Sequence, residues 1–469
     1  MAERYWIETL GCPKNQVDSD KLVGTLVMDG LVAAEAPEEA DLVVVNTCAF
    51  IEAARQESID TVLELSDLRR PGARLVVTGC MAERYGDELA DALPEVDLVA
   101  PFGAALTGAP RASASTAGTP VRLGTKPVAS ASLLPSFDLL NLPRPASAAP
   151  WSYIKIAEGC DRNCGFCAIP SFRGKQRSRT TESILAEVDQ LAGPGGSLRE
   201  VVLVAQDLSS FALDRSTGRT EPRIDGPAVG ALRPIVELVA AVAARVPWTR
   251  LLYLYPSTLD DALVEAILDT GVPYFDLSLQ HVSRPLLKRM RRWGDGDRFL
   301  ERIASIRSDE ATAAFRSSFI IGYPGETEAD HDQLLQWIAE ARLDWTGFFP
   351  FSNEAGTYAA ELDGQIPDEL VAERLRECTE LQDSITAARR ESLIGAIVEV
   401  LVDAPGEGRT YREAPEIDGI VTLSDTVPVG SFVDAVVTGA DGPDLCAELV
   451  GVNHSGTHRS APAVSGAVR

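Results

Sequence analysis

The chain has little histidine and no long apolar run, and each shortage excludes a class of protein. It has four histidines in 469 residues, none near its cysteine-rich segment, which leaves no ordinary Cys/His zinc site there. No apolar stretch approaches the roughly 18–20 residues that cross a bilayer. The first residues, MAERYWIETL, lack the apolar core of a signal peptide. We therefore expect a cytoplasmic protein without a membrane partner.

Basic residues are scarce relative to acidic ones, since 43 lysines and arginines stand against 69 aspartates and glutamates, a formal net charge of −26. Such a chain repels nucleic acid overall and attracts basic partners. Cysteine is also sparse, and eight residues do not make a disulfide framework in a chain of this length. Clustered cysteines in a cytoplasmic chain indicate metal binding or catalysis, whereas the isolated Cys378 and Cys446 are expected to be structural.

Three segments near the N-terminus share one form, a β-branched apolar run that stops at a cysteine. They read YWIETLGC, ADLVVVNTC and ARLVVTGC, and they end at Cys12, Cys48 and Cys80. Helical patterns separate them, one expected at residues 19–31 with Ser19 as its N-cap and one at residues 52–68. Such alternation predicts a parallel sheet whose strands all end at one edge. We therefore expect an N-terminal α/β domain, residues 1–100, in which the three cysteines converge.

The composition changes after residue 100. Of residues 101–150, 29 are Ala, Ser, Pro or Gly, which predicts a linker whose basic residues, Arg144 among them, are solvated. From residue 151 to 391, six strand candidates alternate with helices, which predicts a complete or partial (β/α)6 barrel with its chemistry at the strand carboxyl ends. The strands are expected at residues 153–157, 201–205, 251–255, 274–278, 315–321 and 345–351.

Short strands and turns follow from residue 392, as in AIVEVLVD and FVDAVVTGA. They predict a small β-barrel over residues 392–458. Two segments are expected to lack regular structure: a loop at residues 214–230 and a disordered tail at residues 459–469.

The segment GCDRNCGFC, which ends at Cys167, follows the first strand of the expected core. Cys160, Cys164 and Cys167 on one tight loop are suited to bind three irons of a [4Fe-4S] cluster, which leaves the fourth iron without a protein ligand. Zinc is the alternative, but structural zinc takes four ligands and no fourth cysteine or histidine lies nearby. Buried free thiols would leave the spacing unexplained.

This spacing, after the first strand of a six-unit β/α region, resembles the radical S-adenosylmethionine (SAM) superfamily. The resemblance implies that the open iron binds the amino and carboxylate groups of SAM. It also implies that an electron from the cluster cleaves SAM into methionine and a 5′-deoxyadenosyl radical. A radical of this kind attacks C–H bonds that no side-chain base deprotonates.

The N-terminal cysteines Cys12, Cys48 and Cys80 stand at equivalent strand ends, which favours a second cluster with its own open iron over simple core packing. A three-cysteine α/β domain, a radical-SAM core and a C-terminal barrel together resemble the methylthiotransferase family over nearly the whole chain, residues 4–458. By that resemblance the barrel is a TRAM domain, an OB-like module.

Four stretches resemble the branch of the family that modifies ribosomal protein S-twelve: GCPKN, SLQHVSRPLLKRMRR, IIGYPGETEAD and APGEGRTYREAPEIDGI. The resemblance implies that a methylthio group is added to the β-carbon of one aspartate. One SAM methylates a sulfur species on the N-terminal cluster, and a second SAM yields the radical that removes a β-hydrogen. An electron donor and a sulfur donor are implied as further partners. Residues 389–469 carry 6 basic and 12 acidic side chains, which suits a basic protein substrate.

Several polar residues are candidate contacts of SAM or substrate. Gln206 and Asp207 end the second strand of the core and are expected near SAM. His281 is either a hydrogen-bond donor near SAM or a core residue. The segments RGKQRSR (173–179) and KRMRR (288–292) either pair with carboxylates of SAM or substrate, or face water.

Two rival functions stay open on the sequence alone. A transfer-RNA methylthiotransferase would use the same cofactors, although nucleic acid is not the substrate we expect for so acidic a chain. A non-catalytic iron–sulfur scaffold or RNA-binding protein would release no deoxyadenosine from SAM under reducing conditions.

Overall fold

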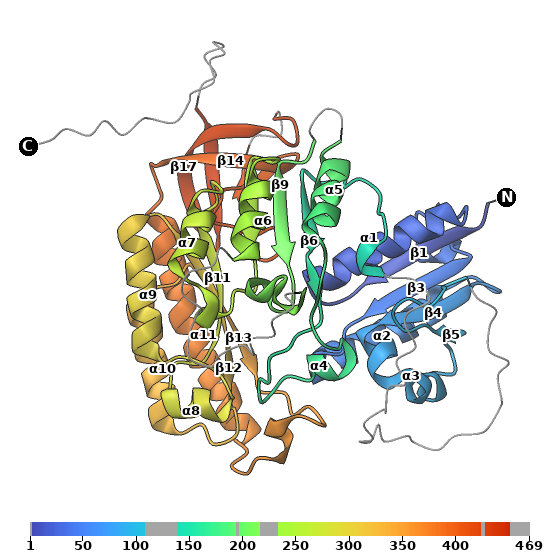
Figure 1. Cartoon of the computed structure of the whole chain (residues 1–469), viewed down its shortest axis with the longest axis horizontal. Coiled ribbons are helices and arrows are strands. Elements are labelled where there is room, and N and C mark those ends of the chain that lie inside the picture. The colour runs from blue at the N-terminus through green and yellow to red at the C-terminus, as the bar shows by residue number, and fades with distance from the viewer. Residues whose placement is uncertain (1, 108–138, 194–196, 216–232, 424–426, 451–469) are drawn as a thin grey trace, which may run out of the picture.

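The computed structural model describes residues 2–107, 139–193, 197–215, 233–423 and 427–450. Residues 108–138 of the expected linker, most of the loop expected at 214–230 and the tail expected at 459–469 lie outside the described residues. Within the described ranges, no helix is both long and apolar enough to cross a bilayer. Figure 1 shows a blue sheet domain, a core that runs from green to orange, and a red barrel beside the core.

The N-terminal domain is a parallel sheet of five strands in the order β2-β1-β3-β4-β5. Its central strand has the sequence LVVVNT and is buried at every residue, as is typical of a parallel strand covered on both faces. The elements are β1 (Arg4–Thr9), α1 (Pro13–Met28), β2 (Val32–Ala33), β3 (Leu42–Thr47), α2 (Glu52–Leu68), β4 (Arg74–Gly79), α3 (Cys80–Ala92) and β5 (Leu98–Val99).

The first helix was expected to begin at Ser19, and that expectation is wrong. Helix α1 begins at Pro13, because a proline at the first helical position has its φ already fixed and lacks only an N–H that would be unpaired anyway. Ser19 is buried within the helix, where its Oγ accepts hydrogen bonds from Thr9 Oγ1 (2.6 Å) and Asn46 Nδ2 (2.9 Å). A residue type common at helix caps therefore serves here to bind α1 to the sheet.

The core is a partial barrel made of two three-stranded parallel sheets, in the orders β10-β9-β6 and β11-β12-β13. A single parallel bridge between Leu254 and Leu277 joins them. The strands are β6 (Trp151–Lys155), β9 (Glu200–Val204), β10 (Trp248–Leu251), β11 (Tyr274–Gln280), β12 (Ala314–Ile321) and β13 (Trp345–Pro350). The outer helices are α5 (Thr181–Ala192), α6 (Pro234–Ala243), α7 (Asp261–Leu268), α9 (Gly296–Asp309), α10 (Glu328–Ala341) and α11 (Asp368–Glu391).

The third core strand was expected at residues 251–255 but runs from Trp248 to Leu251. The chain leaves the sheet at Tyr253, whose φ is +64° and whose N–H donates to the Asp276 carboxylate (2.9 Å). The Asp276 side chain on β11 therefore accepts the N–H of Tyr253, which in a continued strand would donate to a backbone carbonyl. The sequence pattern also missed short elements of the core, among them a hairpin of β7 (Ala157–Glu158) and β8 (Arg177–Ser178), and the helix α8 (Arg284–Arg289).

The linker was expected to have solvated basic residues, and for Arg144, in its described part, that expectation is wrong. Arg144 is 3 % exposed and pairs with Asp20 (2.7 Å) and Glu187 (2.9 Å). Glu187 is buried in α5 and also pairs with Arg179 (2.5 Å), so it needs cationic neighbours to remain ionised in the interior. The linker thus ends in a structural contact with both the N-terminal domain and the core.

The C-terminal unit is a closed barrel in the order β14-β15-β16-β18-β17. Its strands are β14 (Ile397–Ala404), β15 (Glu407–Arg409), β16 (Val421–Thr422), β17 (Phe432–Asp441) and β18 (Asp444–Leu449). The segment between β15 and β16 packs on the amino-terminal ends of the core strands, where Ala414 and Ile417 join an apolar cluster with Tyr153 and Trp345.

Buried ion pairs reinforce this junction between barrel and core. Glu200, the first residue of β9, accepts from Arg250 (2.6 Å) and from Arg409 of the barrel (2.8 Å). Asp418 of the barrel segment pairs with Arg316 of β12 (3.4 Å). The barrel therefore closes the end of the core opposite to the strand carboxyl ends.

Candidate functional site

The cysteines of the N-terminal domain lie at the carboxyl edge of its sheet. Cys12 follows β1, Cys48 follows β3, and Cys80 is the first residue of α3; we call these three the first trio. The three thiols lie within electrostatic reach of one another. Gly11 permits the close approach, because its φ is +95° and a Cβ on it would lie 2.9 Å from the Cβ of Cys48.

Two buried polar side chains fix the first trio against the core. Asn15 is fully buried, and its Nδ2 donates to one backbone carbonyl at the end of each of β1 and β3, at 2.8 and 3.1 Å. Arg173 donates through Nη2 to Cys80 Sγ (3.0 Å) and through Nη1 to the Glu158 carboxylate (3.0 Å). Arg173 belongs to the segment RGKQRSR, and the structure buries it instead of exposing it to water.

The surroundings of the three thiols shift their pKa values in different directions. Burial raises the pKa of Cys48 to about 12, and it also raises the pKa of Cys80, against the opposing effect of Arg173. Burial acts in the same direction on Cys12, but Lys14 and Arg173 outweigh it, so the pKa of Cys12 is lowered. Because the thiolate is the form that binds a metal, these cations favour ligation at Cys12.

The second trio, Cys160, Cys164 and Cys167, lies on the loop between β7 and α4 (Ile169–Phe172). Gly159, which precedes it, has a φ of +79°, and a Cβ there would lie 2.3 Å from the carbonyl oxygen of Lys175. Only glycine therefore lets this loop close against the segment that leads into β8.

Two arginines flank the second trio and hold Tyr255 between them. The guanidinium groups of Arg162 and Arg292 lie 3.9 and 4.0 Å from the centroid of the Tyr255 ring. The backbone N–H of Arg162 donates to Cys160 Sγ (3.4 Å), and Arg292 Nη1 donates to Cys164 Sγ (3.4 Å). N–H donors thus reach two of the three sulfurs in this trio.

The donor sets fit iron–sulfur clusters better than single metal ions. Burial raises the pKa of Cys160 and of Cys167 to about 12, which opposes deprotonation of the thiols. The positive charge of bound iron favours the thiolate and so offsets this effect. Among the described residues, no three His, Cys, Asp or Glu side chains converge as a single ion requires. In a [4Fe-4S] cluster each thiolate binds a different iron, so the three sulfurs need not meet at one point.

The structure separates the three residues that the sequence suggested as SAM contacts. Gln206 and Asp207 lie beside the loop of the second trio: Gln206 Nε2 donates to Glu158 (2.8 Å), and Asp207 accepts from Arg162 Nε (2.6 Å). His281 is fully buried after β11, and its Nδ1 accepts the N–H of Ser283 (3.0 Å). His281 is thus buried in this structure, and a contact with SAM stays a prediction.

The remaining basic residues and cysteines divide between interior and surface. In the first basic segment, Arg179 is buried, whereas Lys175 and Arg177 are exposed. In the second segment Lys288 is exposed. Of the isolated cysteines, Cys378 is buried in α11 and Cys446 is exposed on β18.

Two functional candidates had no interpretation at the level of sequence. Lys14, in the stretch GCPKN, is buried with its Nζ 3.2 Å from the centroid of the Tyr253 ring. Glu354, in the loop after β13, accepts from Arg55 of α2 (2.5 Å) and Arg84 of α3 (2.7 Å), so it joins the core to the N-terminal domain. No local pattern identifies Glu354, because its partners lie 299 and 270 residues away.

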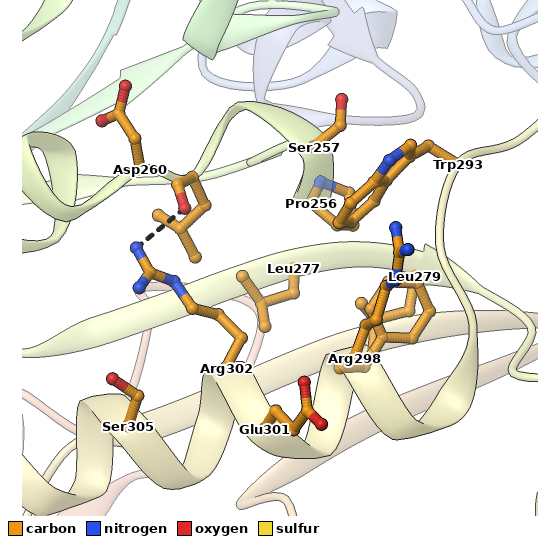
Figure 2. Close-up of a pocket in the computed structure, with 12 residues that line it drawn as sticks. Pro256, Ser257, Asp260, Leu277, Leu279, Trp293, Arg298, Glu301, Arg302 and Ser305 are labelled. Atoms are coloured by element: carbon orange, nitrogen blue, oxygen red, sulfur yellow. Dashed lines mark hydrogen bonds between the residues drawn. The ribbon is translucent and has the colours of Figure 1, made fainter. Parts of the chain in front are cut away.

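A pocket of about 460 Å³ lies outside both trios, between the segment after Tyr255 and helix α9. Figure 2 shows Leu277 and Leu279 of β11 at its floor, with Trp293, Arg298 and Arg302 around it. None of the candidate ligands or SAM contacts lines this pocket.

Family models match the chain in three places. They are the uncharacterized protein family UPF0004 over residues 4–101, the radical SAM superfamily over residues 154–338, and the TRAM domain over residues 394–450. A partial β/α barrel with a three-cysteine loop after its first strand, matched in this way, defines a radical SAM protein.

Curated relatives identify the family. Proteins named "Ribosomal protein uS12 methylthiotransferase RimO" are 40 % identical in Nocardioides sp., covering 93 % of this chain and 95 % of the relative, and 39 % identical in Moorella thermoacetica, covering 93 % and 96 %. A third, from Anaeromyxobacter sp., is 39 % identical and covers 99 % of this chain and 97 % of the relative. This chain therefore belongs to the RimO family of ribosomal protein uS12 methylthiotransferases.

Among solved structures, the radical SAM methyltransferase TsrM from Kitasatospora setae aligns with a TM-score of 0.45 at 12 % identity, covering 84 % of this chain and 91 % of that one. Nothing about function follows from a likeness at this level.

Proposed function

We propose that this protein adds a methylthio group to the β-carbon of an aspartate in ribosomal protein uS12. The family membership supports the reaction, and one contact carries it structurally. Arg173 donates both to Cys80 of the first trio and to Glu158, two residues before the second trio begins. One arginine therefore contacts the first trio and the segment that leads into the second trio, which supports a shared site for the two.

We further propose that each trio holds one [4Fe-4S] cluster, with SAM bound at the second. A reduced cluster with bound SAM supplies the one-electron chemistry that removes hydrogen from an unactivated carbon. The chain's own residues orient the groups: Arg162 and Arg292 donate to the sulfurs of the second trio, and Gln206 and Asp207 are the proposed contacts of SAM.

Iron content tests the two-cluster proposal. Anaerobically reconstituted protein should hold about eight irons per chain, and Cys164→Ala and Cys48→Ala should each hold about four. Cys446→Ala is the matched control, since this exposed cysteine belongs to neither trio, and it should keep about eight. A Cys164→Ala protein that keeps both clusters contradicts the assignment.

We propose residues 1–100, 151–391 and 392–458 as the working units, joined by the segment 101–150. The matched ranges of the family models, which begin at residues 4, 154 and 394, support this division. An external electron donor and an external sulfur donor complete the proposed system, which would act in the cytoplasm, where ribosomal proteins are made.

A direct assay separates this function from modification of transfer RNA. The reconstituted enzyme, with SAM, a reductant and sulfide, is offered a peptide carrying the uS12 target loop or an anticodon stem-loop RNA. We expect methylthiolated peptide and unchanged RNA, because the segment 389–469 is acidic and phosphate contacts need basic residues. Modified RNA with unmodified peptide would overturn the proposal.

A further inference from the structure

Lys14 is a buried cation that forms no ion pair with a carboxylate among the described residues. Its side chain follows Cys12 by two residues and is 9 % exposed. In the described part of the chain, Nζ forms no ion pair and no hydrogen bond, and its contact is the face of the Tyr253 ring. A cation–π contact offsets only part of the free energy that an ammonium group loses on leaving water. The position is therefore suited to an anion that arrives with a ligand.

The neighbouring cations already have hydrogen-bond or ion-pair partners. Arg292 donates through its two Nη atoms to the Ser278 carbonyl and the Cys164 sulfur. The others form ion pairs: Lys155 with Asp18 and Glu158, Arg173 with Asp18 and Glu158, Arg162 with Asp207, and Arg316 with Asp276 and Asp418. Within this set Lys14 is the cation that has neither a carboxylate nor a carbonyl.

Lys14 also lies where the two halves of the site meet. It belongs to the N-terminal domain, whereas Tyr253 belongs to the core and follows β10. Cys12, Arg173, Asp276 and Glu158 lie within its electrostatic reach. Lys14 is thus next to a ligand of the first trio and to the residue pair, Arg173 and Glu158, that leads to the second.

The chemistry of the substrate identifies the missing anion. In an aspartate side chain the carboxylate is bonded directly to the β-carbon, so it must accompany that carbon into the site between the trios. A carboxylate placed near Glu158 and Asp276 without a counter-charge is strongly disfavoured. We propose that Lys14 binds the side-chain carboxylate of the substrate aspartate and so selects it against neutral residues. This inference rests on the proposed function.

Peptide binding without turnover tests the role of Lys14. Fluorescence anisotropy, in the absence of reductant, compares two labelled peptides that carry the uS12 target loop with aspartate or with asparagine at the target position. Wild-type protein should bind the aspartate peptide about tenfold or more tightly, the size expected for a close charge pair. Lys14→Met should abolish this preference by weakening only the aspartate peptide. Lys14→Arg should retain part of it. Arg376→Met, which removes an exposed cation on α11 away from both trios, should retain all of it.

Each other outcome overturns the proposal. A Lys14→Met protein that keeps the preference shows that the carboxylate binds elsewhere. Equal weakening of both peptides shows that Lys14 serves the fold or the first trio, and iron content measured on each variant identifies which. Peptide binding is also measured on the iron-free form of each variant, so that loss of iron in one variant does not decide the result. If wild-type protein binds neither peptide, the proposed function itself fails, and the inference fails with it.

Discussion

A glycine with positive φ precedes three of the six candidate cluster ligands, at Gly11, Gly79 and Gly159. In each case the chain turns sharply at the end of a strand and presents the next side chain at the sheet edge. The sequence made the cysteines visible because they interrupt apolar runs. It did not reveal Lys14 as a site residue. It named Arg173 as a candidate contact of SAM or substrate, but not its bond to Cys80, because the two residues are 93 positions apart and belong to different domains.

His281 provides a pH-dependent test at the residue scale. Burial lowers the pKa of His281 to about 4, below its ordinary value of 6.5. The unfolded chain therefore takes up the proton first as pH falls, and the stability that the neutral ring contributes above pH 6.5 is lost progressively towards pH 4. Between pH 7 and pH 5 the loss from this residue should be about 2 kcal/mol.

His281→Asn removes the titrating group and should flatten this part of the pH profile. Urea unfolding at pH 7 and pH 5 measures the difference, with His331→Asn as the comparison variant, since His331 is also buried but bonds to the Glu377 carboxylate (2.7 Å). Equal pH sensitivity in wild type and His281→Asn would contradict the assignment of His281 as a neutral core residue.

At the scale of elements, periodicity predicted most helices and strands but not where the chain leaves them. Helix α2, Glu52–Leu68, matches its amphipathic pattern, whereas α1 begins before the expected Ser19 because Pro13 directs the chain into the helix. Strand β10 ends early because Asp276 captures the N–H of Tyr253. The start of α1 is thus set by a local signal that the helical pattern missed, whereas the end of β10 is set by a tertiary contact.

The loop after β13 offers a test at this scale, because Glu354 connects it to α2 and α3. Glu354→Ala leaves Arg55 and Arg84 buried without their shared carboxylate, which should cost about 3 kcal/mol of the free energy of unfolding. The control is Asp261→Ala, which breaks an ion pair whose aspartate is 94 % exposed and should cost at most about 1 kcal/mol. Urea denaturation of the two variants measures both costs. Equal losses in the free energy of unfolding would show that the buried contacts of Glu354 stabilise the protein no more than an exposed ion pair does.

At the scale of the whole molecule, the C-terminal barrel is part of the core's packing. Its segment after β15 covers the amino-terminal ends of the core strands, and Arg409 and Asp418 neutralise Glu200 and Arg316 there. The stretch APGEGRTYREAPEIDGI therefore has a structural role that the sequence alone did not show.

A chain that ends at residue 392 should fold poorly. Truncation removes one of the two ion-pair partners of Glu200 and one of the two partners of Arg316. It also exposes the apolar cluster around Tyr153 and Trp345, and the total loss should be at least about 3 kcal/mol. Size-exclusion chromatography and the thermal midpoint compare the truncated chain with the full one. A monomeric truncated protein with an unchanged midpoint would show that the barrel is an independent appendage.

The central claim is that this protein places a methylthio group on uS12. Intact-protein mass spectrometry of uS12, purified from cells with and without this chain, tests it most directly. We predict that uS12 from cells lacking the chain is lighter by one methylthio group in exchange for hydrogen, and that the wild-type chain, but not Cys164→Ala, restores the mass. An identical uS12 mass in both cell types would contradict the account.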